Sequence, residues 1–162
     1  MSNTESRAVK STVVERRMGV FKSLSDVPSR YRLECYSARF DGQDTLGEWA
    51  AENVAKEWRA TEVDLLTSRW VGHMDCLGRH HALATPKDVD GFIAGLLDEM
   101  TIERVHRPYW VELERFYEWL AWHTDYPHCY NPVRMAAAQH PAAGRVWEYK
   151  VTNVRNQSNH YE

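Results

Sequence analysis

The chain has 162 residues, of which 43% are hydrophobic and 27% charged, values typical of one globular domain that buries its own core. No apolar run approaches the roughly 18 residues that span a bilayer, and the first seventeen residues lack a signal-peptide core. We therefore expect a cytoplasmic protein without membrane contacts. The three scattered cysteines, Cys35, Cys76 and Cys129, argue against a disulfide framework.

Charge is distributed unevenly along the chain, although the net charge is only −3. Residues 1–40 hold eight Lys and Arg against four Asp and Glu, whereas residues 41–100 hold five against twelve. Residues 101–162 are balanced at seven each. The overall field of the protein would not attract nucleic acid, so any DNA binding must depend on a local basic surface.

The predicted elements begin with a flexible basic arm over residues 1–23 and an irregular segment rich in turn residues. Helices are expected from Thr45, which has the spacing of a capping box with Glu48. A second helix is expected over residues 61–77, with Gly78 placed to end it. A third begins at "ATPKDVDGF", where Thr85 caps the helix and Pro86 occupies its first turn.

The fourth predicted helix contains the aromatic stretch "FYEWLAWHTDYPHCYNP". From Tyr109 its apolar residues recur at helical spacing, so most of these rings are interpreted as core. The remaining side is expected to be solvated; its residues are Glu112, Glu114, Arg115 and Glu118. Pro108 is expected to kink or restart the helix. Asn131 and Pro132 then cap a last helix, or a broken pair of helices.

Strand patterns are nearly absent, so the fold class is all-α, a compact helical bundle with four main helices. The expected domain covers residues 24–155, with core helices at about 61–150, followed by a frayed tail at 156–162. An extra helix at the N-terminal side accompanies the flexible arm.

The histidines and cysteines do not form a recognisable metal site. Structural zinc sites use paired ligands at spacings such as C-x₂-C or H-x₃-H. Two such pairs are supplied neither by His73, Cys76, His80 and His81 nor by the later loop with His123, His128 and Cys129. A zinc site using His73, Cys76, His123 and Cys129 remains an alternative to core and surface roles. Motifs for nucleophilic catalysis or phosphate loops are absent, and no cofactor is expected.

Candidate DNA contacts are basic or polar residues near helix starts and on the last helix. Helix N-termini offer N–H groups and a positive dipole end to phosphate. The alternative for each is a surface residue that only aids solubility. The candidates are Arg79, His81, Thr85, Lys87, Arg134, Arg145 and Lys150.

Two stretches, "RWVGHMDCLGRHHALATPKDVDGFIAGLL" and "TIERVHRPYWVELERFYEWLAWHTDYPHCYNPVRMAAA", resemble the core-binding domain of tyrosine recombinases, the phage-integrase type. The likeness is greatest to versions from haloarchaea and their viruses and covers about residues 24–150. It implies a SAM-like helical domain that holds one side of a double-stranded DNA recombination site. Its motifs are mostly core and capping residues, so they specify fold better than activity.

The chain departs from that family where the chemistry lies. Recombinases carry an H-x-x-R pair and a tyrosine nucleophile in a second domain, and H-x-x-R occurs nowhere here. We expect no DNA cleavage by this chain alone, whether it is an accessory protein, a truncated relic or half of a split recombinase with a catalytic partner subunit. The predicted function is recognition or occlusion of recombination-site DNA. The alternative is a protein–protein interaction module that kept the fold.

Overall fold

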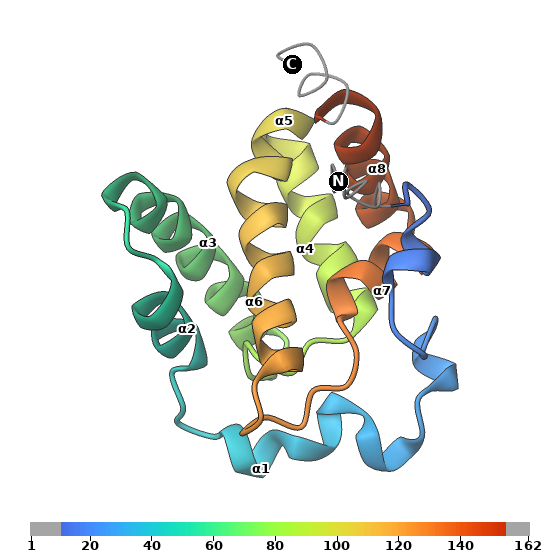
Figure 1. Cartoon of the computed structure of the whole chain (residues 1–162). Coiled ribbons are helices and arrows are strands. Elements are labelled where there is room, and N and C mark those ends of the chain that lie inside the picture. Colours follow the sequence, from blue (N-terminus) through green and yellow to red (C-terminus); the bar gives the residue numbers. More distant parts are fainter. Residues whose placement is uncertain (1–10, 155–162) are drawn as a thin grey trace, which may run out of the picture.

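A computed structural model describes residues 11–154, and this part of the chain folds into helices and turns without a strand (Figure 1). The all-α prediction is confirmed. The first ten residues of the predicted arm and the predicted frayed tail at 156–162 lie outside the described residues. None of the helices in the described range combines the length and the apolar character that crossing a membrane requires.

Residues 11–40 form a series of single turns instead of long helices. These are η1 (Val14–Arg17), η2 (Leu24–Asp26), η3 (Ser29–Tyr31), η4 (Leu33–Tyr36) and α1 (Ser37–Phe40). Val14, Val27, Leu33 and Phe40 are all buried in the common core. Residues 11–23, expected to belong to a flexible arm, therefore follow a defined path against the helices, because Val14 anchors them there.

Helices α2 (Thr45–Asn53) and α3 (Glu57–Cys76) lie together at the left of Figure 1. The capping residue of α2 is Asp44, whose carboxylate accepts the Gly47 N–H at 3.0 Å, and the prediction of Thr45 was wrong by one position. Thr45 is buried instead. At the other end of α3, Gly78 has φ +69° and ends the helix as predicted, because this conformation disfavours residues with a Cβ.

Helix α4 (Pro86–Glu99) begins where the sequence predicted. The Thr85 hydroxyl accepts the Asp88 N–H at 3.2 Å, and the Asp88 carboxylate accepts the Thr85 N–H at 2.9 Å. This reciprocal capping box satisfies two N–H groups that the helix itself leaves unpaired.

Helix α6 (Val111–Trp122) runs through the middle of the bundle, preceded by α5 (Ile102–Arg104) and the wide turn η5 (Val105–Trp110). Arg107, just before Pro108, has non-helical angles and forms the expected kink. The expectation of a solvated side was wrong for Glu112 and Glu114, which are only 1% and 7% exposed. A central helix has neighbours on several sides, so part of its polar side is buried as well.

The last helices are a broken pair, α7 (Pro132–Gln139) and α8 (Pro141–Tyr149), followed by η6 (Lys150–Val154). The Asn131 side chain accepts the Val133 N–H at 2.9 Å, as the predicted N-cap of α7. Pro141 starts α8. Both helices pack against α4.

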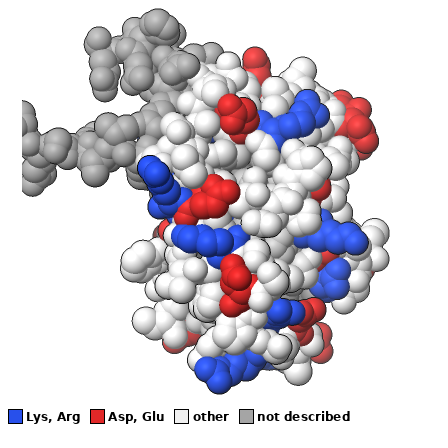
Figure 2. All heavy atoms as spheres, turned by 90° about the vertical axis from the view of Figure 1, so that its right-hand side faces the viewer, with Lys and Arg blue, Asp and Glu red and all other residues white. Residues whose placement is uncertain are grey.

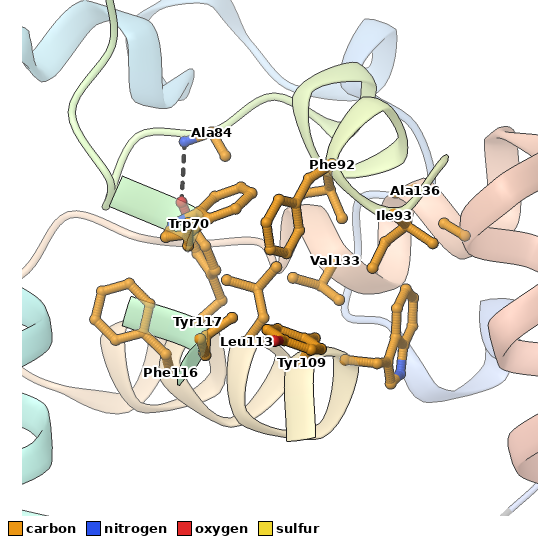
Figure 3. Packing of buried hydrophobic residues seen from close by; sticks show 14 of the residues in the cluster. Trp70, Ala84, Phe92, Ile93, Tyr109, Leu113, Phe116, Tyr117, Val133 and Ala136 are labelled. Carbon is orange, nitrogen blue, oxygen red and sulfur yellow. Dashed lines mark hydrogen bonds between the residues drawn. The ribbon is translucent and has the colours of Figure 1, made fainter. Parts of the chain in front are cut away.

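Aromatic side chains from several helices meet at the centre of the bundle (Figure 3). Trp70 of α3 meets Phe92 of α4 edge to face, with ring centroids 5.0 Å apart. The fully buried Tyr117 hydroxyl accepts the Ala84 N–H at 3.0 Å and donates to the His81 carbonyl at 2.8 Å. The aromatic stretch is therefore core up to Leu120, as predicted; it leaves the core at Trp122 and returns to it at His128 and Tyr130.

Candidate nucleic-acid interface

Two predicted DNA contacts, Arg79 and Thr85, belong to the start of α4. Arg79 donates to both carboxylate oxygens of Asp88 at 2.8 Å, and Asp88 is only 4% exposed. Burial raises the pKa of the Asp88 carboxyl, but the hydrogen bonds from Arg79 and Thr85 outweigh it and the net shift is downward. A phosphate would have to displace Arg79 from a buried carboxylate, which is costly.

The surroundings of Arg79 are also unfavourable for a polyanion. Arg79 opens onto a hollow of about 750 Å³. Its lining includes three carboxylates, from Glu34, Asp41 and Asp75. Their negative charge repels phosphate, so we assign Arg79 and Thr85 to the structure of the α4 cap.

His81 and Lys87 flank this cap and differ in exposure. His81 Nε2 lies 2.7 Å from the Thr45 hydroxyl oxygen. Burial, together with the neighbouring His80, lowers the pKa of His81 to about 4, so the ring is neutral at pH 7 and offers phosphate no charge. Lys87 is exposed, and no acidic partner for it occurs among residues 11–154.

Arg134 and Lys150 are held in an ion-pair network between α6, α7 and η6. Lys150 Nζ lies 2.8 Å from one oxygen of Glu114, and Arg134 Nη1 lies 2.9 Å from Glu118. Burial lowers the pKa of the Lys150 ammonium, and the attraction of Glu114 offsets this only partly. Lys150 therefore compensates a buried carboxylate. Arg145, in contrast, is exposed on α8.

The N-terminal segment, residues 11–22, docks on α7 and α8 through specific bonds. Trp147 Nε1 donates to the Thr12 carbonyl at 2.9 Å, and Arg134 Nη1 donates to the Arg17 carbonyl at 3.2 Å. The Arg17 guanidinium lies 4.9 Å from the centre of the Trp147 ring, a cation–π distance. Lys22 then closes the turn by donating to backbone carbonyls of this segment.

This docking forms a pocket of about 430 Å³ between the N-terminal segment, the end of α6 and the start of α7. Arg16, Arg17 and Arg134 all line it. The indole of Trp122, which is 80% exposed, stands at the same pocket. We call this feature the arginine–tryptophan pocket.

The balance of charge differs between the two sides of the molecule. In Figure 1 the N-terminal segment, α7 and α8 lie at the right, while α2 and α3 lie at the left. Residues 11–40 contribute six Lys and Arg against three acids, and residues 132–154 contribute three against one. Residues 45–76, which form α2 and α3, hold three Lys and Arg against six acids. Figure 2 shows the right-hand side, where basic and acidic groups are interspersed across the surface.

The structure thus brings together only part of the predicted site. Arg134 and Arg145 lie on the α7–α8 side, and Lys87 stands apart at the start of α4. Arg134 and the other four residues have structural partners. Sequence reasoning did not single out Arg16 and Arg17. The basic excess of the first forty residues was their only signal, because nothing in the local pattern shows where such a segment docks.

The residues considered for zinc do not converge. His73 bonds to the Asp88 carbonyl in the middle of the molecule, and His128 Nε2 lies 2.7 Å from the Ala82 carbonyl. Between residues 11 and 154, no three His, Cys, Asp or Glu side chains are grouped as metal ligands. The histidines of the aromatic stretch therefore serve packing and hydrogen bonding.

Comparison with protein-family models, curated proteins and solved structures finds no match for this chain.

Proposed function

We propose that this chain binds double-stranded DNA, chiefly through phosphate contacts, on the side formed by the N-terminal segment, α7 and α8. The observation that carries the proposal is the docking of residues 11–22, which places Arg16 and Arg17 beside Arg134. Residues 45–76, which form α2 and α3 on the opposite side, hold six Asp and Glu against three Lys and Arg, so that side would attract DNA less.

The proposed role follows the resemblance to recombinase core-binding domains. The chain would recognise or occlude a recombination site without cutting the DNA itself. Phosphate contacts from arginines would set its position, and base contacts would add limited sequence preference. A catalytic recombinase subunit is the partner that would supply cleavage.

The test is fluorescence anisotropy of a labelled random-sequence duplex at several salt concentrations. The logarithm of the affinity should fall linearly with the logarithm of the salt concentration, with a slope of about −0.9 for each phosphate neutralised. Arg16→Ala and Arg145→Ala should each weaken binding to all sequences. Each should also reduce the magnitude of the slope by about 0.9, the share of one phosphate contact.

Lys56→Ala is the matched control, because Lys56 is an exposed lysine just before α3 on the opposite side. It should leave both affinity and slope unchanged. Lys87→Ala tests separately whether the start of α4 contacts DNA. If Lys87→Ala reduces the slope and Arg145→Ala does not, the assigned side is incorrect. An absence of binding at low salt would refute the DNA function.

A protein-interaction function is the second candidate, and the outer side of α3 favours it. Trp58 and Leu65, seven residues apart on that helix, are 53% and 49% exposed. Glu57, Asp64 and Asp75 are exposed on the same helix. An apolar stripe with acidic surroundings suits a basic helix of a partner protein. Leu65→Arg should abolish such a complex, which a pull-down with a candidate recombinase subunit would measure. The same variant should leave the affinity for DNA unchanged.

A further inference from the structure

Trp122 is the least buried tryptophan in the described part of the chain, and its ring is nevertheless held in place. It is 80% exposed, whereas Trp49, Trp70 and Trp110 are at most 2% exposed. The Trp122 Nε1 donates to a Glu118 carboxylate oxygen at 3.0 Å, one turn back on α6. The indole therefore presents its surface to solvent in a defined orientation. A large exposed aromatic ring of this kind is typical of a binding surface.

The pocket beside Trp122 has an apolar lining suited to a flat ring. Met18, Phe21 and Ala121 contribute carbon surface to the volume of about 430 Å³. Tyr130, also in the lining, is only 6% exposed, and its hydroxyl accepts the Leu33 N–H at 3.0 Å. The volume lies within the range of pockets for small organic ligands.

Guanidinium groups surround this apolar lining. Arg16 is exposed at the pocket, and Arg134 is fixed by its bonds to Glu118 and to the Arg17 carbonyl. Glu118 is the one acidic residue of the lining. Its carboxylate forms an ion pair with Arg134 and accepts a hydrogen bond from the Trp122 N–H, so its charge is compensated within the protein. The pocket therefore combines an aromatic ring and an apolar wall with positive charge.

We propose that the arginine–tryptophan pocket binds an unpaired nucleotide, whose base stacks on Trp122 and whose phosphate meets Arg16. This inference rests on the proposed function, since it assigns to one part of the DNA-binding side a preference for unpaired DNA. Aromatic rings that stack bases, combined with cations that follow the backbone, are the general means of binding single strands. A base inside a duplex is already stacked on both sides, so only an unpaired base can offer its ring to Trp122.

The experiment compares a blunt duplex with the same duplex carrying a short adenine overhang, both at one salt concentration. For the unmodified chain, the overhang should increase affinity by about 5- to 150-fold, the range for stacking one base on an aromatic side chain. Trp122→Ala should remove this gain and leave the affinity for the blunt duplex unchanged. Trp122→Phe, which retains a ring, should keep part of the gain.

Trp58→Ala is the matched control, because Trp58 is 53% exposed on the other side of the molecule. It should keep the full gain from the overhang. Circular dichroism should show the same helix content in every variant, since an exposed ring adds little to folding. Competition with free dAMP distinguishes a pocket that accepts an isolated nucleotide from one that needs the attached strand, and both results agree with the proposal.

The outcomes separate this inference from the proposed function. Blunt-duplex binding without an overhang gain, or a gain that survives in Trp122→Ala, would overturn the pocket assignment and leave duplex binding intact. A Trp122-dependent affinity for single strands without duplex binding would overturn the proposed function and support the pocket. No binding to any of these DNAs would overturn both.

Discussion

Replacing Lys150 by methionine tests whether this residue serves the fold or meets DNA. Methionine keeps much of the apolar stem of lysine and removes its charge. In the structure Lys150 Nζ lies 2.8 Å from Glu114, and the two side chains are 22% and 10% exposed. Loss of the ammonium would leave the Glu114 carboxylate with Arg134 as its remaining cationic partner, whose Nε lies 4.0 Å away.

The magnitude follows from the cost of breaking a buried pair. Removing one partner of such a pair typically costs about 3–5 kcal/mol, because the other charge stays buried without compensation. Lys150 is half-buried and Arg134 remains nearby, so we expect the lower end, about 3 kcal/mol. For a domain of this size the melting temperature should fall by about 6–12 °C.

Thermal unfolding followed by circular dichroism measures the effect, and two further variants make it specific. The double variant Lys150→Met with Glu114→Gln removes both charges and should recover a large part of the lost stability. Arg145→Ala on α8 should change stability by less than about 0.5 kcal/mol, because Arg145 is exposed. If Lys150→Met melts like the unmodified chain but loses DNA affinity, our assignment of Lys150 to the ion-pair network is incorrect.

Two further predictions concern the buried core. Burial lowers the pKa values of His106 and His128 to about 4 from an ordinary value near 6.5, so the unfolded chain binds protons that the folded chain does not. Their contribution to stability is complete above pH 6.5 and declines towards pH 4. Urea unfolding should therefore show that the free energy of unfolding falls by about 2 kcal/mol per histidine at pH 5. A stability that does not change with pH would contradict this prediction. Tyr117→Phe removes a hydroxyl that bonds to Ala84 and to His81, and should cost about 1–3 kcal/mol in urea unfolding at pH 7. A cost below about 0.5 kcal/mol would show that the two backbone groups find other partners.

Local features of the chain were predicted accurately because their physics involves only a few neighbouring residues. Thr85, Pro86 and Asp88 form a capping box whatever surrounds them, since the bonds close within one turn. Gly78 ends α3 because its positive φ requires no partner elsewhere in the chain. The apolar period of α6 likewise identified Tyr117 as core. These features predicted the all-α fold.

The candidate site depended on contacts between residues of different elements, which the pattern within one helix does not contain. Lys150 looks like a surface lysine until α6 places Glu114 beside it, 36 residues earlier in the chain. Arg79 resembles a free cation until α4 brings Asp88 to it. The same reasoning explains why Glu112 and Glu114 were expected in solvent: periodicity shows one apolar side of a helix but cannot show that neighbours also cover the other.

Sequence alone was sufficient for the all-α class, the helix boundaries at Gly78, Thr85 and Asn131, and the basic excess of the first forty residues, because propensity, capping and charge are properties of short segments. It assigned the N-cap of α2 to Thr45 and the start of α3 to Thr61, and both assignments were wrong.

The tertiary structure decided which cations lie together, since Trp147 and Arg134 hold the N-terminal segment across more than a hundred residues. That docking positions Arg16 and Arg17 and creates the pocket at Trp122. A charge becomes part of a binding surface only when folding has determined its neighbours, and these neighbours come from distant parts of the chain.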